Sequence, residues 1–457
     1  MTDYEGFRQH IVSSIENFNK IPKNEKVRII SHLDADGISA CAILIYALTS
    51  ENRPHSISIV EQLDEEIVKK LANEPYTTYI FSDIGSGQLD IINKNMANKR
   101  VFIIDHHTPE GEAGKNIIHI NPHLFGIDGG KEISGAGIAY LFSSALNKKN
   151  EKLAHLAIIG AIGDIQEENG FRKLNQQILE KALENGSIEI KKSLNVFGSH
   201  TRPIHKSLEY SNLLPDMSES EIIQLIQSIG INPISEKGWK KMTDLTDEEL
   251  KALTAAIIMK RINTENPEDI FTNHYTLKDG EEGTAFRDVK EFATLLNSCG
   301  RLNRASIGLG ACLGDKDARK KAKSVSEEYK KELGNALNWY REEADIVKGK
   351  NYVIINAKDK ILHTIAGTLA SIISKSKEYP DGTFVMCLAR SKTAKNITKV
   401  SLRMSGNKEY DVREVMKQIT EKIGGQAGGH RSAAGALINT NMEDDFIKTS
   451  IEIFEKQ

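Results

Sequence analysis

The sequence has few cysteines and no long apolar run, and both absences limit what the protein can be. Its 457 residues include four cysteines, Cys41, Cys299, Cys312 and Cys387, and no two of them form a CxxC pair. We therefore expect reduced thiols in the core of a cytoplasmic protein, not disulfides or a thiolate zinc site. No run of about twenty apolar residues occurs, and the start, MTDYEGFRQH, has no apolar run of signal-peptide length. The sequence predicts no membrane span.

An excess of positive charge is also missing. The formal net charge is −3. Overall charge therefore cannot hold a nucleic acid, and such a partner would need a local basic groove or metal ions acting on its phosphates. Aromatic residues make up only 6% of the chain, which argues against a long ladder of rings that stack on bases. Hydrophobic residues at 39% and charged residues at 27% are typical of a globular protein, and the length suits two or three domains.

The first third of the chain alternates β-rich runs with helical patterns. The strand-like runs are KVRIIS (26–31), HSISIVE (55–61), TTYIFSD (77–83) and RVFIIDHH (100–107). ISACAILIYALTS and LDEEIVKKLAN, which lie between them, have helical spacing. This alternation predicts an α/β fold with a parallel sheet and helices on both of its faces.

The rest of the chain divides into three parts. Residues 205–285 carry amphipathic helical patterns with capping residues and no strand patterns. We therefore expect a helical insertion in a domain whose first part is 1–204. Residues 286–347 return to that domain and end in a long, charged connecting helix. Strand patterns reappear at NYVIINA, TFVMCLA, TKVSLRMS and AAGALIN, which predicts a smaller α/β domain over 348–457.

Unusual polar residues are concentrated in four segments of the first domain. Each segment ends an apolar strand or helical run, and together they supply His32, Asp34 and Asp36; Asp83; Asp105, His106 and His107; and Asp164. A single aspartate at such a place is usually a helix cap or a turn residue. Four such segments in one βαβ array indicate a ligand site instead, because the carboxyl ends of parallel strands meet at one edge of the sheet.

The number of carboxylates at this edge points to divalent cations. Five aspartates cannot all be ionised in a small space without countercharge. Mixed carboxylate and imidazole ligands suit Mn²⁺ or Mg²⁺ better than a structural zinc ion. Two such ions about 4 Å apart would hold a phosphate and make a bound water more acidic. We therefore expect a site for two metal ions.

The order of these segments resembles the DHH phosphoesterase superfamily, whose motifs run H-x-D-x-D-G, an Asp after the next strand, D-H-H and a distal Asp. The resemblance implies that Asp83 bridges two ions, that His107 is catalytic or faces the phosphate, and that Asp105 supports the site. It implies the following metal ligands: His32, Asp34, Asp36, Asp83, His106 and Asp164.

Later stretches extend the resemblance. AGGHRSAAG (427–435) is similar to the G-G-G-H-x-x-A-A-G motif of the family's companion substrate-binding domain, the DHHA1 type, with Ala427 in place of the first glycine. This glycine-rich stretch is expected to form a turn that cradles phosphate. NSCGRLNRASIGLGACLGD (297–315) resembles a stretch of RecJ-like nucleases. The implied substrate contacts are Arg301, Ser401, Arg403, Gly428, Gly429 and His430.

The chain resembles in particular the archaeal RecJ-like exonucleases, some of which associate with the replication complex GINS. This implies an exonuclease, dependent on Mn²⁺ or Mg²⁺, that cuts single-stranded DNA or RNA to nucleoside monophosphates in replication or repair. It also implies that 205–285 is the contact for GINS or another replication protein. Two alternatives stay open: a phosphodiesterase of short oligonucleotides or cyclic dinucleotides, and a replication scaffold, as in the eukaryotic helicase subunit that has lost its metal ligands.

Overall fold

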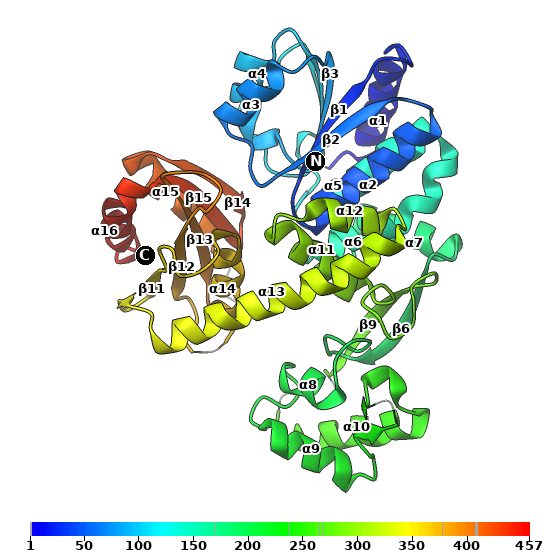
Figure 1. The fold of residues 1–457 in the computed structure, drawn as a ribbon, viewed down its shortest axis with the longest axis vertical. Coiled ribbons are helices and arrows are strands. Elements are labelled where there is room, and N and C mark those ends of the chain that lie inside the picture. The colour runs from blue at the N-terminus through cyan, green and yellow to red at the C-terminus, as the bar shows by residue number, and fades with distance from the viewer. Residues whose placement is uncertain are drawn as a thin grey trace. The chain divides into compact units, whose positions relative to one another are not determined.

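The computed structural model describes residues 2–168, 170–236, 238–264, 266–267, 269–376, 378–406 and 410–457. The chain forms two compact units. The first comprises 1–300 and 305–323, and the second comprises 301–304 and 324–457. The predicted long helix is α13 (Lys316–Glu342), and the boundary between the units falls within it (Figure 1).

The first unit is built on a five-stranded sheet in the order β2-β1-β3-β4-β5, and all its pairings are parallel. The strands are β1 (Val27–His32), β2 (His55–Val60), β3 (Thr78–Ser82), β4 (Arg100–Ile104) and β5 (Ile117–Ile120). Parallel pairing brings the carboxyl ends of β1, β3 and β4 to one edge, as the sequence predicts. The strand β5 was not predicted.

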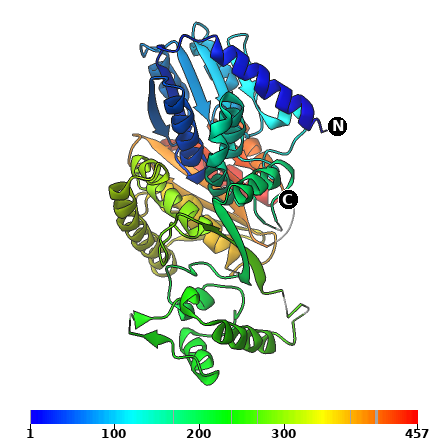
Figure 2. The same cartoon turned by 90° about the vertical axis from the view of Figure 1, so that its right-hand side faces the viewer.

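Helices cover both faces of this sheet (Figures 1 and 2). On one face, α3 (Glu65–Ala72) and α4 (Leu89–Asn95) pack over the buried rings of Tyr79 and Phe81. The other face is covered by α1 (Tyr4–Asn19), α2 (Ala35–Ser50) and α5 (Gly135–Leu146), and α6 (Ala154–Gly163) packs against α2 and α5. On that face the rings of Phe18 and Phe142 meet Phe102 edge to face. Two covered faces explain why β1, β3 and β4 are buried over nearly their whole length, whereas the edge strand β2 is only partly buried.

The remaining elements of this unit surround the sheet or lead away from it. The helices are η1 (Ser86–Gln88), η2 (Pro122–Phe125), η3 (Lys148–Leu153), α7 (Lys173–Glu184), α11 (Val289–Arg301) and α12 (Ala305–Cys312). The strands β6 (Ile188–Leu194) and β9 (Phe271–Leu277) pair antiparallel as a two-stranded ribbon. The ribbon carries the insertion at its end (Figure 1).

The insertion is mainly helical, with α8 (Ile204–Glu209), α9 (Glu219–Ser228), η4 (Met242–Asp244) and α10 (Asp247–Lys260). Ser218 and Thr246 begin α9 and α10 with capping boxes, which confirms the predicted caps. The expectation that 205–285 has no strands is wrong. It contains the hairpin of β7 (Ile234–Ser235) and β8 (Gly238–Trp239), and also β9. Two-residue strands are too short to leave a periodic pattern.

The second unit has a six-stranded sheet in the order β10-β11-β12-β13-β15-β14. Its strands are β10 (Ile346–Lys348), β11 (Tyr352–Asn356), β12 (Phe384–Arg390), β13 (Ile397–Met404), β14 (Gln426–His430) and β15 (Ala433–Asn439). Only the β11–β12 pairing is parallel. The helices are α14 (His363–Lys375), α15 (Val412–Ile423), η5 (Thr440–Met442) and α16 (Glu443–Phe454). The hydrophobic core on one face of the sheet contains residues of α14, and the core on the other face contains residues of α15 and α16.

The glycine-rich stretch at 427–435 differs from the expectation. Gly428 and Gly429 lie in the edge strand β14 and pair with β15, so they do not form a turn. The φ angle of Gly429 is +126°, and a Cβ there would lie 2.3 Å from the carbonyl oxygen of Ala433. Strand pairing at this angle therefore requires glycine. The side chain of His430 lies outside the described part of the structure.

All four cysteines are buried and free, which confirms that they are core thiols. Within the described residues, no helix combines the length and the apolar character that crossing a membrane requires.

Candidate metal centre

The six predicted metal ligands all come from the ends of elements at one edge of the first sheet. His32 is the last residue of β1. Asp83 directly follows the end of β3, and His106 lies two residues after the end of β4. Asp34 is the N-cap of α2 and Asp36 lies in its first turn. SHLDADG therefore brings its ligands together by turning from strand to helix, not along an extended chain. Asp164 is the C-cap of α6.

Three overlapping groups of side chains in this region could each hold a cation. In each group the ligand atoms lie within 4.8 Å of one another. The groups are Asp83, His106 and His107; His32, Asp34 and Asp83; and Asp36, His106 and Asp164. Every predicted ligand belongs to a group, and Asp83 and His106 each belong to two of them.

Asp83 provides the test of whether a cation fits this site. Its side chain is 1% exposed, and neither of its oxygens accepts a hydrogen bond within the described part of the chain. Instead, Oδ1 lies 3.2 Å from Nε2 of His106, and Oδ2 lies 3.6 Å from Nδ1 of His32. A buried carboxylate that accepts no well-formed hydrogen bond is unfavourable unless positive charge compensates it, and protonated imidazoles or a bound cation can supply that charge here. The φ angle of Asp83 is +56°, a strained conformation that often marks functional sites. The donor set therefore fits divalent cations.

Two glycines allow the neighbouring helices to approach these carboxylates. At the start of α5, the N–H groups of Gly135 and Ala136 donate to Asp36 at 2.6 and 3.0 Å. A Cβ on Gly135 would lie 2.5 Å from Oδ1 of Asp83, and a Cβ on Gly160 would lie 2.3 Å from Oδ1 of Asp36. The backbones of α5 and α6 thus form part of the wall of the site.

Four of the predicted metal ligands, two aspartates and two histidines, have raised pKa values. Burial, together with the charges of Asp83 and Asp164, raises the pKa of Asp36 well above its usual range. Burial also raises the pKa of Asp164 to about 6. Burial opposes the charged form of His32, but Asp34 and Asp83 outweigh it, so the pKa of His32 is raised well above the usual value. His106 behaves in the same way because three aspartates surround it.

Acidification is therefore expected to weaken Mn²⁺ binding. At low pH, Asp164, His32 and His106 hold protons that a cation must displace, so proton uptake favours the metal-free protein. The Mn²⁺ concentration at half-maximal binding should rise as the pH falls, by about tenfold per pH unit for each proton displaced, and Asp164 should add to this slope below about pH 6. The rise in melting temperature on adding Mn²⁺ measures this between about pH 5 and about pH 8. An unchanged midpoint over this range would contradict the assignment.

A hydrogen-bonded layer behind the metal groups supports His107. Its Nδ1 lies 2.7 Å from Oδ1 of Asp105, whose other oxygen accepts the N–H of Ser86 at 2.8 Å. The hydroxyl of Ser86 lies 2.8 Å from Nε2 of His119 and accepts a 2.8 Å hydrogen bond from Asn121. Asp105 is fully buried and belongs to none of the three metal groups, so it orients His107 instead.

Sequence reasoning missed most of this layer. The sequence analysis singled out none of these three residues: Ser86, His119 and Asn121. The available signal was weak: Ser86 lies in the glycine-rich loop after Asp83, and His119 interrupts an apolar run.

The second unit brings together three of the predicted substrate contacts. Arg301 donates to the hydroxyl of Thr368. A Cβ on the adjacent Gly367 would lie 3.3 Å from Oγ of Ser401 and 3.4 Å from Nη2 of Arg403. Burial and the charge of Arg301 lower the pKa of Arg403 to about 10. Within the described residues neither guanidinium pairs with a carboxylate, so the two charges are available to an anion.

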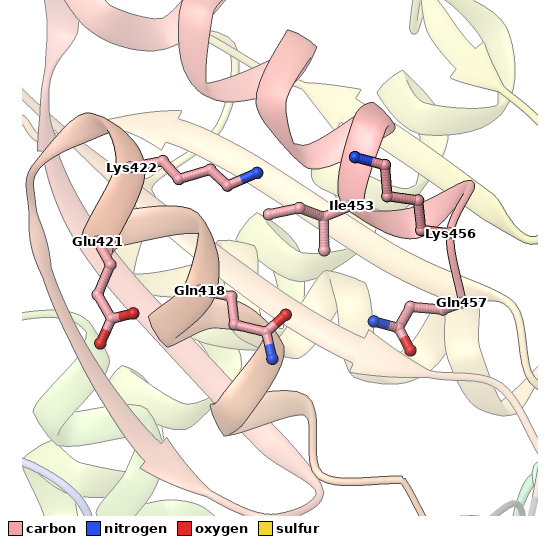
Figure 3. A pocket seen from close by; sticks show the side chains of 6 residues that line it. All are labelled: Gln418, Glu421, Lys422, Ile453, Lys456 and Gln457. Carbon is pink, nitrogen blue, oxygen red and sulfur yellow. The ribbon is translucent and has the colours of Figure 1, made fainter.

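The other predicted contacts lie in the same sheet. Gly435 of β15 pairs with Ser401 on one side and with Gly428 on the other, so Gly428 lies two strands from Ser401. A surface hollow of about 290 Å³ between α15 and α16 contains none of these residues. Its lining mixes charges of both signs around one apolar side chain (Figure 3): Gln418, Glu421, Lys422, Ile453, Lys456 and Gln457.

Comparison with family models agrees with this division of the chain. Residues 26–162 match the N-terminal domain of the DHH family, 196–272 match the DHH-CID domain, and 349–456 match the DHHA1 domain. An uncharacterized protein of Methanocaldococcus jannaschii is 31% identical over 440 residues, which cover 94% of each chain.

Solved structures share the fold at low sequence identity. RecJ of Thermus thermophilus, solved with Mn²⁺, has a TM-score of 0.61 and 16% identity. The match covers 99% of this chain but only 55% of that one, so the present chain spans about half of that RecJ. CDC45 of Entamoeba histolytica has a TM-score of 0.63 and 13% identity, and the match covers 99% of this chain and 98% of that one. The fold is thus that of RecJ and of CDC45.

Proposed function

The chain belongs to the DHH family, and from this premise we propose that it is a two-metal phosphodiesterase that hydrolyses single-stranded DNA or RNA to nucleoside monophosphates. The observation that carries the proposal is the set of three overlapping ligand groups, two of which contain the buried Asp83. A scaffold would have no need to keep this concentration of buried aspartates and histidines, since their desolvation is unfavourable.

The side chains have distinct roles in the proposed reaction. When bound, two divalent ions polarise the phosphate and supply an acidic water as nucleophile. The hydrogen bond between Nδ1 of His107 and Asp105 would orient the ring so that His107 can act as a general acid toward the leaving oxygen. Burial opposes its charged form, but Asp105 raises the pKa of His107, which suits that role. The ions would be held by His32, Asp34, Asp36, Asp83, His106 and Asp164.

The substrate would be held by its phosphates. Arg301 and Arg403 offer two guanidinium groups and Ser401 a hydroxyl, and all of these bind phosphate oxygens irrespective of the base. Recognition should therefore be independent of sequence and should weaken with salt.

Digestion of end-labelled oligonucleotides tests the function. Single strands of DNA and RNA, labelled at either end and of increasing length, are incubated with Mn²⁺, Mg²⁺ or a chelator. We expect mononucleotide products with metal, none with chelator, and faster turnover of long strands than of dinucleotides. Turnover of dinucleotides or cyclic dinucleotides alone would favour the alternative substrate class. No cleavage of any strand with Mn²⁺ would refute the proposal.

Arg403→Ala is expected to weaken substrate binding more than turnover. Loss of a charge-assisted hydrogen bond to phosphate should raise KM for single strands about tenfold to a hundredfold and leave kcat within about threefold. Arg304→Ala is the matched control, because Arg304 belongs to the same unit but pairs with Glu328 on the surface. Steady-state kinetics distinguishes the two parameters. An unchanged KM for Arg403→Ala would remove Arg403 from the binding site.

A second role, binding of a replication protein such as GINS through 205–285, is favoured by the surface of the insertion. Six of the twelve large apolar side chains that are exposed in the described chain lie there: Tyr210, Ile234, Trp239, Met259, Ile262 and Phe271. Exposed aromatic residues are common at the centres of protein interfaces. The double variant Tyr210→Ser, Trp239→Ser should lose capture of purified GINS and keep hydrolysis. Equal capture by the variant would contradict this role.

A further inference from the structure

Helix α11 lies directly against the turn that carries three predicted metal ligands. A Cβ on Gly300 would lie 1.8 Å from the carbonyl oxygen of Leu33, which no side chain tolerates. Three residues earlier on the same helix, Oδ1 of Asn297 accepts a 2.9 Å hydrogen bond from the N–H of Ala35. The helix therefore contacts the backbone of residues 32–36 at two points.

The contact from Asn297 supplies a missing cap. The first N–H groups of a helix have no acceptor within the helix. At the start of α2, Oδ1 of Asp34 accepts the N–H of Gly37 at 3.0 Å. Its Oδ2 lies 2.9 Å from Nδ1 of His32, within a candidate metal group. The N–H of Ala35 is instead satisfied by Asn297, a residue of another helix.

We propose that Asn297 is a positioning residue of the metal centre, which acts through the backbone of Ala35. Ala35 lies between Asp34 and Asp36 in the sequence. A change in the orientation of the peptide plane between Asp34 and Ala35 would therefore move both carboxylates. The Asn297 hydrogen bond fixes that peptide, and the contact of Gly300 with Leu33 fixes the preceding one. The first residue of the NSCGRLN stretch thus has a role distinct from that of Arg301.

Binding of Mn²⁺ to the full-length protein tests this inference without measuring hydrolysis. For Asn297→Ala, the Mn²⁺ concentration that gives half of the maximal rise in melting temperature should increase about tenfold to a hundredfold, as is usual when a residue that orients metal ligands is lost. Asn297→Asp keeps an oxygen acceptor, so its midpoint should stay within about threefold of the wild type.

Thr294→Ala is the matched control. It removes the side-chain hydrogen bond from Thr294 to the carbonyl of Lys290 on the same helix and leaves the metal turn untouched, so its midpoint should not change. An unchanged midpoint for Asn297→Ala overturns the inference, and so does an Asp variant as weak as the Ala variant. If Asn297→Ala fails to fold, Asn297→Ser is compared with the Asp variant in its place.

The inference rests on the proposed function only in treating the centre as a metal site. If the protein binds Mn²⁺ with the expected ranking of variants but cleaves no strand, the hydrolytic proposal fails and the role of Asn297 stands. If the wild type binds no Mn²⁺, both fail.

Discussion

Asp83→Asn is expected to abolish hydrolysis and to leave the fold intact. Asp83 belongs to two of the three ligand groups, so under the proposed mechanism its loss would remove a ligand shared by two ions. The loss of several kcal/mol of transition-state stabilisation corresponds to a fall in kcat of about a thousandfold or more. Asparagine tolerates the left-handed conformation of this position, where φ is +56°, better than alanine does. Turnover at saturating Mn²⁺ is the measurement.

Thermal unfolding separates this effect from misfolding. Without metal, the variant loses attraction to His32 and His106 but also repulsion from Asp36, so its melting temperature should differ from the wild type by only a few degrees. The rise caused by Mn²⁺ should disappear. Asp90→Asn, an exposed site in the same unit, should keep both that rise and full activity. Substantial turnover of Asp83→Asn with added Mn²⁺ would count against this site.

His107→Gln is expected to lower kcat on oligonucleotides by about a hundredfold to ten-thousandfold, the usual contribution of a general acid. The loss should depend on the leaving group. A nucleotide alkoxide needs a proton as it departs, whereas the p-nitrophenolate of a p-nitrophenyl nucleotide ester does not. The variant should therefore approach wild-type turnover on the aryl ester. Parallel kinetics on the two substrates measures this difference.

Equal losses on both substrates would identify His107 as a metal ligand or a phosphate contact instead of an acid. Asp105→Asn should show the same dependence on the leaving group with a smaller loss, because it disturbs the hydrogen bond that orients the ring. His155→Gln provides the control, since His155 belongs to none of the metal groups and its ring contacts a backbone carbonyl.

The residues of the metal centre could be predicted because their positions follow from local rules. Apolar runs set the strands, and parallel strands place their final residues at one edge, so Asp83 and His106 needed no knowledge of distant contacts. Asp164 was recognised in the same way from the end of an apolar helical run. The prediction for SHLDADG was less accurate. An extended chain was expected there, but Asp34 caps α2 and the helix already begins at Ala35.

The residues that sequence reasoning missed depend on contacts between distant parts of the chain. Asn297 accepts a hydrogen bond from Ala35, which is 262 residues away in the sequence, and the hydroxyl of Ser86 contacts His119, which is 33 residues away. No periodicity or spacing links such pairs. The edge strand β14 was mistaken for a turn for a related reason, since glycines usually mark turns and only its pairing with β15 defines it as a strand.

Both ends of the insertion connect to the first unit through the ribbon of β6 and β9. Leu194 faces Phe271 in the terminal pair of the ribbon, and Asn195 donates to the carbonyl of Ile270 at 2.7 Å. The chain thus leaves and rejoins the first unit at adjacent points. An Asn-Gly splice between Leu194 and Phe271 would close a tight hairpin there. Such a splice would leave the pairings of the parallel sheet unchanged, but it would remove the donors that His200 and Thr201 supply to the buried carboxylate of Glu291 on α11.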